Sequence, residues 1–149
     1  MITYRTTTFT EAWPLIKDLV SDQWGEVDHR RKTSQLDVME ETYSKMEAIG
    51  VHYIVLAESD DTIVGYNSMF ITNSPHTSTL HAVTDTIYVS PSVRGDGVGT
   101  GLIKGAEEEA KSRGAEHIMV TFKNDQGHPN IVEELGFFSY ETIYSKAIG

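Results

Sequence analysis

Apolar residues at alternating and helical spacings divide the N-terminal part of the chain into a strand and a helix. Ile2 to Thr6 has the pattern of a short strand. Thr10 is a candidate cap for a helix that ends near Trp24-Gly25. The polar segment from Ser21 to Thr33 is predicted to be a loop. The helical prediction depends on an apolar stripe made of Ala12, Leu15, Ile16, Leu19 and Val20.

A second helix is predicted after this loop. Ser34 with Asp37 resembles a capping box, which favours a helix start at this point. Gly50 is the predicted end of the helix. The residues expected on its apolar face are Leu36, Met39, Tyr43 and Met46.

Three strands are predicted in the middle of the chain. Residues 51–57 and 63–71 are rich in β-branched and aromatic side chains, and Ser59-Asp60-Asp61 between them is a turn signal. The two runs are expected to pair as an antiparallel hairpin. After a loop at residues 73–76, residues 79–89 have the pattern of a third strand.

The C-terminal part begins with a glycine-rich turn at residues 94–99. The order of all predicted elements indicates an α/β fold of the α+β type, with a mixed and mostly antiparallel sheet, in one domain that spans residues 1–149. The elements expected after the turn are a helix closed by Gly114, a strand over 117–122, a short helix over 130–135 and a final strand or hairpin over 137–148.

Composition and charge narrow the possible functions. The chain has 149 residues, and its net charge of -10 disfavours nonspecific nucleic-acid binding. With no cysteine in the sequence, disulfides, thiolate zinc sites and cysteine nucleophiles are excluded. No signal peptide or long apolar run is present, so we expect a cytoplasmic protein without a membrane anchor. The six histidines show no zinc-ligand spacing, and no metal is expected.

The glycine-rich turn carries the candidate chemistry. A strand stops at Pro91, and the turn opens directly into a helix, whose first N–H groups and dipole favour an anion. Glycines leave room for a phosphate, and Arg94 adds a positive charge. The sequence therefore predicts a diphosphate-binding loop. Neither the Walker nor the Rossmann spacing is met, which excludes both of those nucleotide sites.

The turn resembles the signature of the GNAT superfamily of N-acetyltransferases. Arg94-Gly95-Asp96-Gly97-Val98-Gly99 fits the pattern Arg/Gln-x-x-Gly-x-Gly/Ala, and Val89-Ser90-Pro91 fits the lead-in. Leu135-Gly136-Phe137 is similar to a Leu-Gly-Phe near the end of such proteins. The similarity of individual residues runs from about Thr79 to Phe137, while the N-terminal part agrees in element order.

The resemblance implies a GNAT fold in which a splayed pair of strands holds acetyl-CoA. Main-chain groups of Ile87 and Val89 are then expected to contact the pantetheine arm, and Asn124 to contact the coenzyme elsewhere. The pyrophosphate is expected on the backbone of Arg94, Gly95, Asp96, Gly97, Val98, Gly99 and Thr100.

Transfer of an acetyl group to an amine requires removal of a proton, because an ammonium is not nucleophilic. Asp85 is the candidate base, four residues before Val89. Simple alternation places Asp85 on one face of its strand with His81, Ile87 and Val89, unless a bulge intervenes. With no cysteine available, direct attack in a ternary complex is the expected mechanism.

The expected general acid is missing from its usual place. Many GNAT proteins carry a tyrosine four residues before the glycine of Leu-Gly-Phe, where this chain has Val132. Tyr140, Tyr144, His128 and water are the alternatives for protonating the thiolate, and Tyr144 is the candidate residue. The substitution also supports a second hypothesis, a noncatalytic acyl-CoA-binding or sensing module.

The acceptor is expected near the first two helices, as the resemblance implies. Trp24, Glu26 and Asp28 are candidate acceptor contacts there, together with His81 on the third central strand. The acceptor class stays open between small polyamine-like or aminoglycoside-like amines, protein amino groups and modified nucleobases. A homodimer could form through the exposed edge of the last predicted strand.

Overall fold

Five strands form one sheet in the order β1-β2-β3-β4-β5 in the computed structural model, which describes residues 1–27, 30, 34–122 and 130–149. Neighbouring strands from β1 to β4 are antiparallel, whereas β5 runs parallel to β4. The mixed, mostly antiparallel sheet predicted from the sequence is thus confirmed. The strands are β1 (Ile2–Thr7), β2 (His52–Ser59), β3 (Thr62–Ser74), β4 (Thr79–Val89) and β5 (Ala115–Met119).

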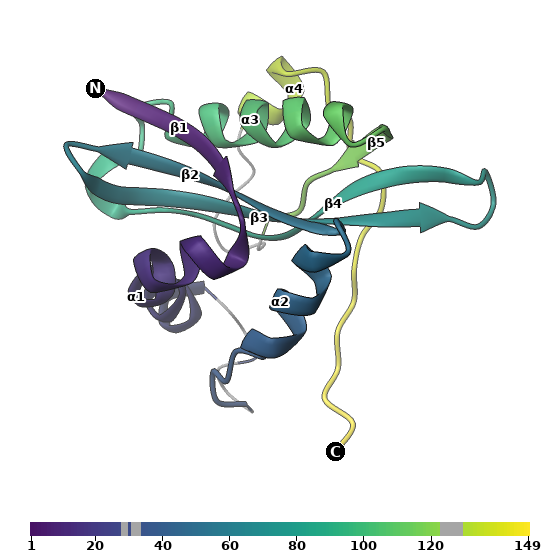
Figure 1. Cartoon of the computed structure of the whole chain (residues 1–149), viewed down its shortest axis with the longest axis horizontal. Coiled ribbons are helices and arrows are strands. Elements are labelled where there is room, and N and C mark those ends of the chain that lie inside the picture. The colour runs from purple at the N-terminus through teal and green to yellow at the C-terminus, as the bar shows by residue number, and fades with distance from the viewer. Residues whose placement is uncertain (28–29, 31–33, 123–129) are drawn as a thin grey trace.

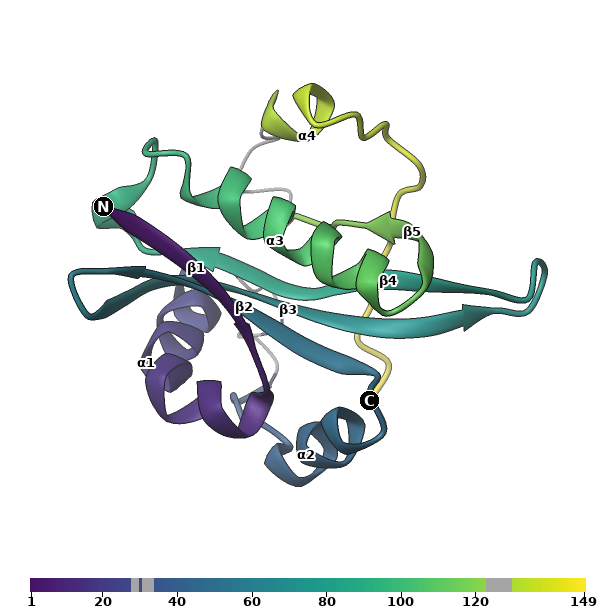
Figure 2. The same cartoon turned by 45° about the horizontal axis from the view of Figure 1, so that its top comes forward.

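Helices cover both faces of the sheet (Figures 1 and 2). Two helices, α1 (Phe9–Val27) and α2 (Glu40–Ala48), lie on one face, which we call the α1/α2 face. The opposite face carries α3 (Val98–Ser112) and α4 (Asn130–Glu134), and we call it the α3 face. In the described part of the chain, no helix combines the length and apolar character needed to cross a membrane.

Burial on both faces explains the composition of the central strands. Residues 52–57 of β2 are all buried, because their side chains point alternately into two separate cores. The core of the α3 face includes Leu102 and Ala106 of α3. The core of the α1/α2 face includes Phe9 and Ile16 of α1.

The first helix differs from its prediction at both ends. It begins at Phe9, and its N-terminal turn is capped by Thr8, whose hydroxyl accepts a 3.3 Å hydrogen bond from the amide of Glu11. Thr10 is therefore not the cap. The helix extends to Val27, so the loop prediction is wrong for residues 21–27. Buried hydrogen bonds of Gln23 to the sheet explain the extension, because local polarity does not report such contacts.

The second helix starts later than predicted. It begins at Glu40, and Met39 precedes it without a side-chain capping bond, so the capping box at Ser34 and Asp37 is wrong. The helix has no buried residue, and it ends before Gly50, which adopts φ +81°. A short polar motif alone did not locate the helix start.

The final strand predicted over residues 137–148 is also wrong. This segment contains no strand or helix, and the side chains of Phe138 and Tyr144 are 81% and 91% exposed. It leaves α4 on the α3 face and ends on the other side of the sheet (Figures 1 and 2). Alternation reports which side chains share a face, but a strand also needs a backbone partner. The dimer predicted through this strand therefore lacks its pairing edge.

Candidate active site

The parallel strands β4 and β5 separate halfway along β4. Their pairing ends at Val83 and Met119, where the hydroxyl of Thr84 also donates to the Met119 carbonyl over 3.3 Å. From Thr84 to Val89, β4 pairs with β3 alone among the strands of the described chain. The two strands therefore leave a gap along the second half of β4, as the splayed pair predicted from the sequence requires.

Backbone groups of Ile87 and Val89 face this gap. The amide of Ser90 donates to the Val64 carbonyl of β3 over 2.8 Å. In an antiparallel strand, the N–H and C=O groups of successive residues point alternately toward the partner strand and away from it. Since Ser90 bonds to β3, the N–H and C=O groups of Val89 and Ile87 point away from β3. These are the two residues predicted to contact a pantetheine arm.

Gln23 of α1 reaches the same part of β4. Its side-chain amide donates to the Ile87 carbonyl over 3.1 Å. Its oxygen accepts hydrogen bonds from the hydroxyls of Tyr66 (2.5 Å) and Thr86 (2.6 Å). Gln23 is only 8% exposed. Buried hydrogen bonds therefore connect α1 to the part of β4 that borders the gap. Sequence reasoning missed Gln23, because it lies 64 residues from Ile87 in a segment interpreted as a loop.

The glycine-rich turn presents bare backbone at the start of α3. Gly95 and Gly97 adopt φ +92° and +79°, which favour glycine. Gly97 is the residue before the helix, and no side chain caps the N–H groups of the first turn. A Cβ atom added at either glycine would meet nothing within 4 Å, so the space in front of the turn is open. The geometry fits an anion held by backbone N–H groups.

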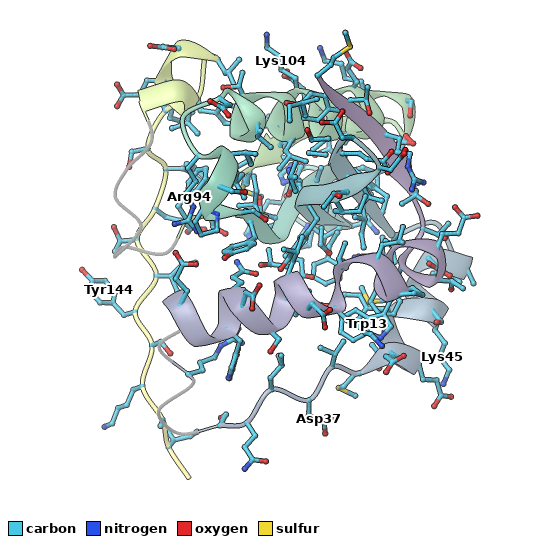
Figure 3. The ribbon with its side chains drawn as sticks, turned by 90° about the vertical axis from the view of Figure 1, so that its left-hand side faces the viewer. Trp13, Asp37, Lys45, Arg94, Lys104 and Tyr144 are labelled. Atoms are coloured by element: carbon cyan, nitrogen blue, oxygen red, sulfur yellow. The ribbon has the colours of Figure 1, made fainter. Side chains whose placement is uncertain are left out.

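Arg94 lies between the turn and the C-terminal end of α1 (Figure 3). Its guanidinium pairs with Glu26 over 2.7 Å, donates to the Val89 carbonyl over 3.0 Å and lies over the Tyr88 ring. The hydroxyl of Tyr88 donates to Glu26. Hydrogen bonding to Arg94 lowers the pKa of Glu26, and the same bond raises the pKa of Arg94. Glu26, which was predicted to contact the acceptor, thus forms an ion pair with Arg94 at the start of the glycine-rich turn.

A bulge in β4 changes the faces predicted by alternation. Thr84 and Thr86 pair with consecutive residues of β3, which leaves Asp85 as the extra residue between them. Asp85 and Thr86 both bond to groups on the α1/α2 face, whereas Ile87 is part of the core on the α3 face. The bulge that the sequence analysis allowed for is present, so Asp85 does not share a face with Ile87 and Val89.

Asp85 accepts two hydrogen bonds from side chains distant in sequence. The hydroxyls of Tyr43 (2.7 Å) and Ser68 (2.8 Å) both donate to its Oδ2 atom. Burial and the charge of Asp85 raise the pKa of Tyr43, which keeps this hydroxyl protonated as a donor. Sequence reasoning missed Tyr43 and Ser68, since no local motif links them to Asp85.

His52 extends this chain of hydrogen bonds. Its Nε2 atom lies 2.7 Å from the Ser68 hydroxyl. Burial lowers the pKa of His52 to about 4, so the ring is neutral at neutral pH. Because the Ser68 proton is directed to Asp85, we assign the proton of the His52 ring to Nε2, which then donates to Ser68. The three groups form one chain of hydrogen bonds, buried at His52 and half-buried at Asp85, that orients the carboxylate.

Two other predicted residues, His81 and Trp24, make contacts with residues of the described chain. The His81 ring lies 5.0 Å from that of His117 on β5, and the Trp24 ring lies beneath Arg30. Tyr144 points away from the rest of the molecule (Figure 3).

Three further positions were singled out in the sequence. Asp28 and Asn124 lie outside the described residues, so their predictions are untested. Val132, at the position where a tyrosine was expected from the resemblance, is 5% exposed and packs in the core of the α3 face. Among the described residues, no cluster of His, Asp and Glu side chains could hold a metal ion.

Comparison with known proteins gives a consistent result for the fold. The model of the acetyltransferase (GNAT) family matches residues 13–137. No curated protein sequence matches the chain significantly. A transcriptional regulator from Bacillus halodurans C-125 has a similar structure, with a TM-score of 0.76, 20% sequence identity and coverage of 99% of this chain and 100% of the other.

Two aminoglycoside acetyltransferases are also similar in structure. One, from an uncultured soil metagenomic sample and in complex with sisomicin, has a TM-score of 0.76 at 14% identity, with 99% of this chain and 95% of that chain covered. The other, in complex with CoA, has a TM-score of 0.75 at 15% identity with the same coverage. At these identities the likeness shows the fold, and the sheet with its separated strands is the fold of GNAT acetyltransferases.

Proposed function

Because the chain belongs to the GNAT acetyltransferase family, we propose that it is an acetyl-CoA-dependent N-acetyltransferase that acts directly on a primary amine in a ternary complex. One observation carries the proposal: Asp85 lies two residues after Val83, the last residue of β4 that pairs with β5. A candidate base therefore lies beside the gap in which the family resemblance puts the acyl donor.

The described residues fit the coenzyme. The uncapped turn from Gly97 to Thr100, with Arg94 beside it, suits a pyrophosphate. Backbone groups of Ile87 and Val89 face the gap and suit the amide groups of a pantetheine arm. The carbonyls of these two residues accept bonds from Gln23 and Arg94, so we expect both side chains to rearrange when the coenzyme binds.

Acetyl-CoA supplies an activated acyl group as a thioester. The contribution of Asp85 is to accept a proton from the incoming amine, directly or through one water molecule. The hydroxyls of Tyr43 and Ser68 hold the carboxylate in one orientation, and His52 holds Ser68. Placing the amine and the donor together supplies much of the remaining acceleration.

Protonation of the departing thiolate is assigned to water in this proposal. His128, the histidine considered from the sequence, lies outside the described residues, so that alternative is untested. Val132 packs in the core of the α3 face and has no proton to give. The side chains of Tyr140 and Tyr144, the tyrosines considered from the sequence, are 72% and 91% exposed. A solvent proton is therefore the source that needs no movement of the C-terminal segment.

The alternative is a noncatalytic acyl-CoA-binding or sensing module, which the loss of a tyrosine at Val132 favours. The first test is thermal unfolding with acetyl-CoA and CoA, with NADH and ATP as controls. A ligand at ~100 times its Kd stabilises the native state by about 2.7 kcal/mol, enough for a visible shift. A shift with the coenzyme A ligands followed by thiol release in the presence of amines supports the enzyme. A folded protein that shows no shift would contradict both functions.

A further inference from the structure

Two carbonyls of β4 beside the gap accept hydrogen bonds from the chain's own side chains. Past Val83 the strand β5 no longer pairs with β4, so backbone groups on this side of β4 need other partners. The side-chain amide of Gln23 donates to the Ile87 carbonyl over 3.1 Å, and Nε of Arg94 donates to the Val89 carbonyl over 3.0 Å. The free protein therefore fills hydrogen-bonding positions that the proposed coenzyme would use.

Glu26 of α1 holds Arg94 in this position. The Nη1 atom of Arg94 lies 2.7 Å from one oxygen of the Glu26 carboxylate, and the hydroxyl of Tyr88 donates to the other oxygen over 2.8 Å. The Tyr88 ring packs against the guanidinium, with 5.5 Å between the Arg94 Cζ atom and the ring centroid. These partners belong to α1 and β4, so the contacts keep the guanidinium between the glycine-rich turn and the C-terminal end of α1 (Figure 3).

The space in front of the glycine-rich turn is open to a different anion. A Cβ atom added at Gly95 or Gly97 would meet nothing within 4 Å. Arg94 directly precedes Gly95, so its guanidinium can serve a phosphate at the turn or the carboxylate of Glu26, and guanidinium groups bind both kinds of anion strongly. Hydrogen bonding to Arg94 lowers the pKa of Glu26, so a carboxylate holds Arg94 at neutral pH. The two anions therefore need the same cation.

We propose that Glu26 competes with the pyrophosphate of the coenzyme for Arg94 and so limits the affinity of the site, an inference that rests on the proposed function. In the free protein the ion pair keeps Arg94 on the Val89 carbonyl, beside the gap. When the coenzyme binds, Arg94 turns to the pyrophosphate, and the Val89 carbonyl becomes available to the pantetheine arm. Glu26 then loses its cationic partner, so coenzyme binding costs the free energy of this ion pair.

Replacing Glu26 by glutamine tests the competition. E26Q keeps the size of the side chain and an oxygen that can accept from Tyr88, but it removes the charge that holds Arg94. Because partly exposed ion pairs are weak, we expect the Kd for acetyl-CoA to fall by about fivefold. D22N is the matched control, since Asp22 lies one turn earlier on α1 and its charge also acts on Tyr88. Calorimetry of the three proteins should place the Kd of D22N within about twofold of the wild type.

Ionic strength provides a second readout, which a change in packing would not move. Salt screens interactions between partly exposed charges, and the screening length falls from about 10 Å at 0.1 M salt to about 3 Å at 1 M. We therefore expect the ratio of the wild-type Kd to the E26Q Kd to fall from about five toward one over this range. A ratio that is the same at both salt concentrations would show that E26Q acts through packing, and would overturn the competition.

The remaining outcomes distinguish the competition from the proposed function. Equal Kd values of the wild type and E26Q, or equal gains in E26Q and D22N, would overturn the competition and leave acetyl-CoA binding intact. Weaker binding by E26Q would also overturn it, because Glu26 would then position Arg94 for the coenzyme. A folded wild type that acetyl-CoA does not stabilise in thermal unfolding would overturn the proposed function and this inference together.

Discussion

At the scale of single residues, Asp85 owes its position to one extra residue in β4. The bulge turns Asp85 toward the α1/α2 face while Ile87 stays on the α3 face, so the carboxylate and the backbone of the gap point to different places. Ala82 and Ile87 both lie in the core of the α3 face although they are five residues apart, and the bulge accounts for this shift. Because of the bulge, β4 can present the candidate base Asp85 on one face and also form one edge of the gap between β4 and β5.

Replacing Asp85 by asparagine tests its role as a base. D85N keeps the size of the side chain and removes the proton acceptor. We expect turnover to fall by roughly 10²–10⁴-fold, with the Kd for acetyl-CoA changed by less than about twofold. Turnover is measured by thiol release and the Kd by calorimetry. Wild-type turnover of the variant at all pH values would remove Asp85 from this role.

Gln23 is expected to contribute to stability through its buried partners. Q23L leaves the hydroxyl of Tyr66, which is 0% exposed, without its acceptor. We expect a loss of about 1–3 kcal/mol in the free energy of unfolding. The double variant Q23L/Y66F removes both polar groups and should recover part of this loss. Urea unfolding of the wild type, both single variants and the double variant measures the coupling, and additive effects would contradict it.

At the scale of elements, the start of α3 is the part of the site that the sequence predicted best. Glycines with positive φ, a strand that stops at proline and a helix that begins within the turn are all local properties, so a local pattern reports them. The partners of Asp85 could not be found in this way. Tyr43 lies 42 residues away on a helix with no buried residue, and only the packed sheet brings it to β4.

The prediction of a final strand was wrong because a local pattern was present without a pairing partner. The sequence from Phe137 to Ile148 alternates as a strand does, yet no strand pairs with it in the described chain. The predicted end of α1 was wrong because tertiary contacts, such as those of Gln23, extend the helix through polar residues. Local patterns thus predicted the type of most elements, and packing decided their ends.

The anion site at α3 is tested by two substitutions of Gly97. Asparagine and aspartate both tolerate the left-handed conformation that Gly97 adopts, and they differ in charge. We expect G97D to weaken acetyl-CoA binding by about tenfold or more relative to G97N, because its carboxylate would face the pyrophosphate. Calorimetry measures both Kd values. Equal affinity of the two variants would remove the pyrophosphate from this turn.

At the scale of the whole molecule, the hydrogen-bond chain from His52 to Asp85 couples the site to stability. His52 lies on β2, Ser68 on β3 and Asp85 on β4, so the chain crosses three neighbouring strands. Its inner end is deeply buried, because His52 is 1% exposed. A proton added to His52 would place a charge in the core of the α1/α2 face.

Acid should therefore destabilise the fold in a defined range of pH. Burial lowers the pKa of His52 to about 4, with Arg113 lowering it further and Glu47 opposing the shift. In the unfolded chain the pKa is about 6.5, so between these values the unfolded state binds a proton that the folded state excludes. The free energy of unfolding then falls as the pH drops from about 6.5 to about 4, by on the order of 3 kcal/mol from this residue, and His52 contributes no further loss below that range.

Two glutamine variants isolate this contribution. H52Q removes the titrating group and keeps a side-chain amide that can donate to Ser68, whereas H76Q removes an exposed histidine in the loop between β3 and β4. In urea unfolding at several pH values from 4 to 7, we expect the wild type and H76Q to lose stability together with acid, and H52Q to lose less. The gap between H52Q and the wild type should narrow as the pH falls, because only the wild type binds the unfolded-state proton at His52. Parallel pH profiles of H52Q and the wild type would show that His52 is protonated equally in both states, and would contradict its assignment as a neutral donor to Ser68.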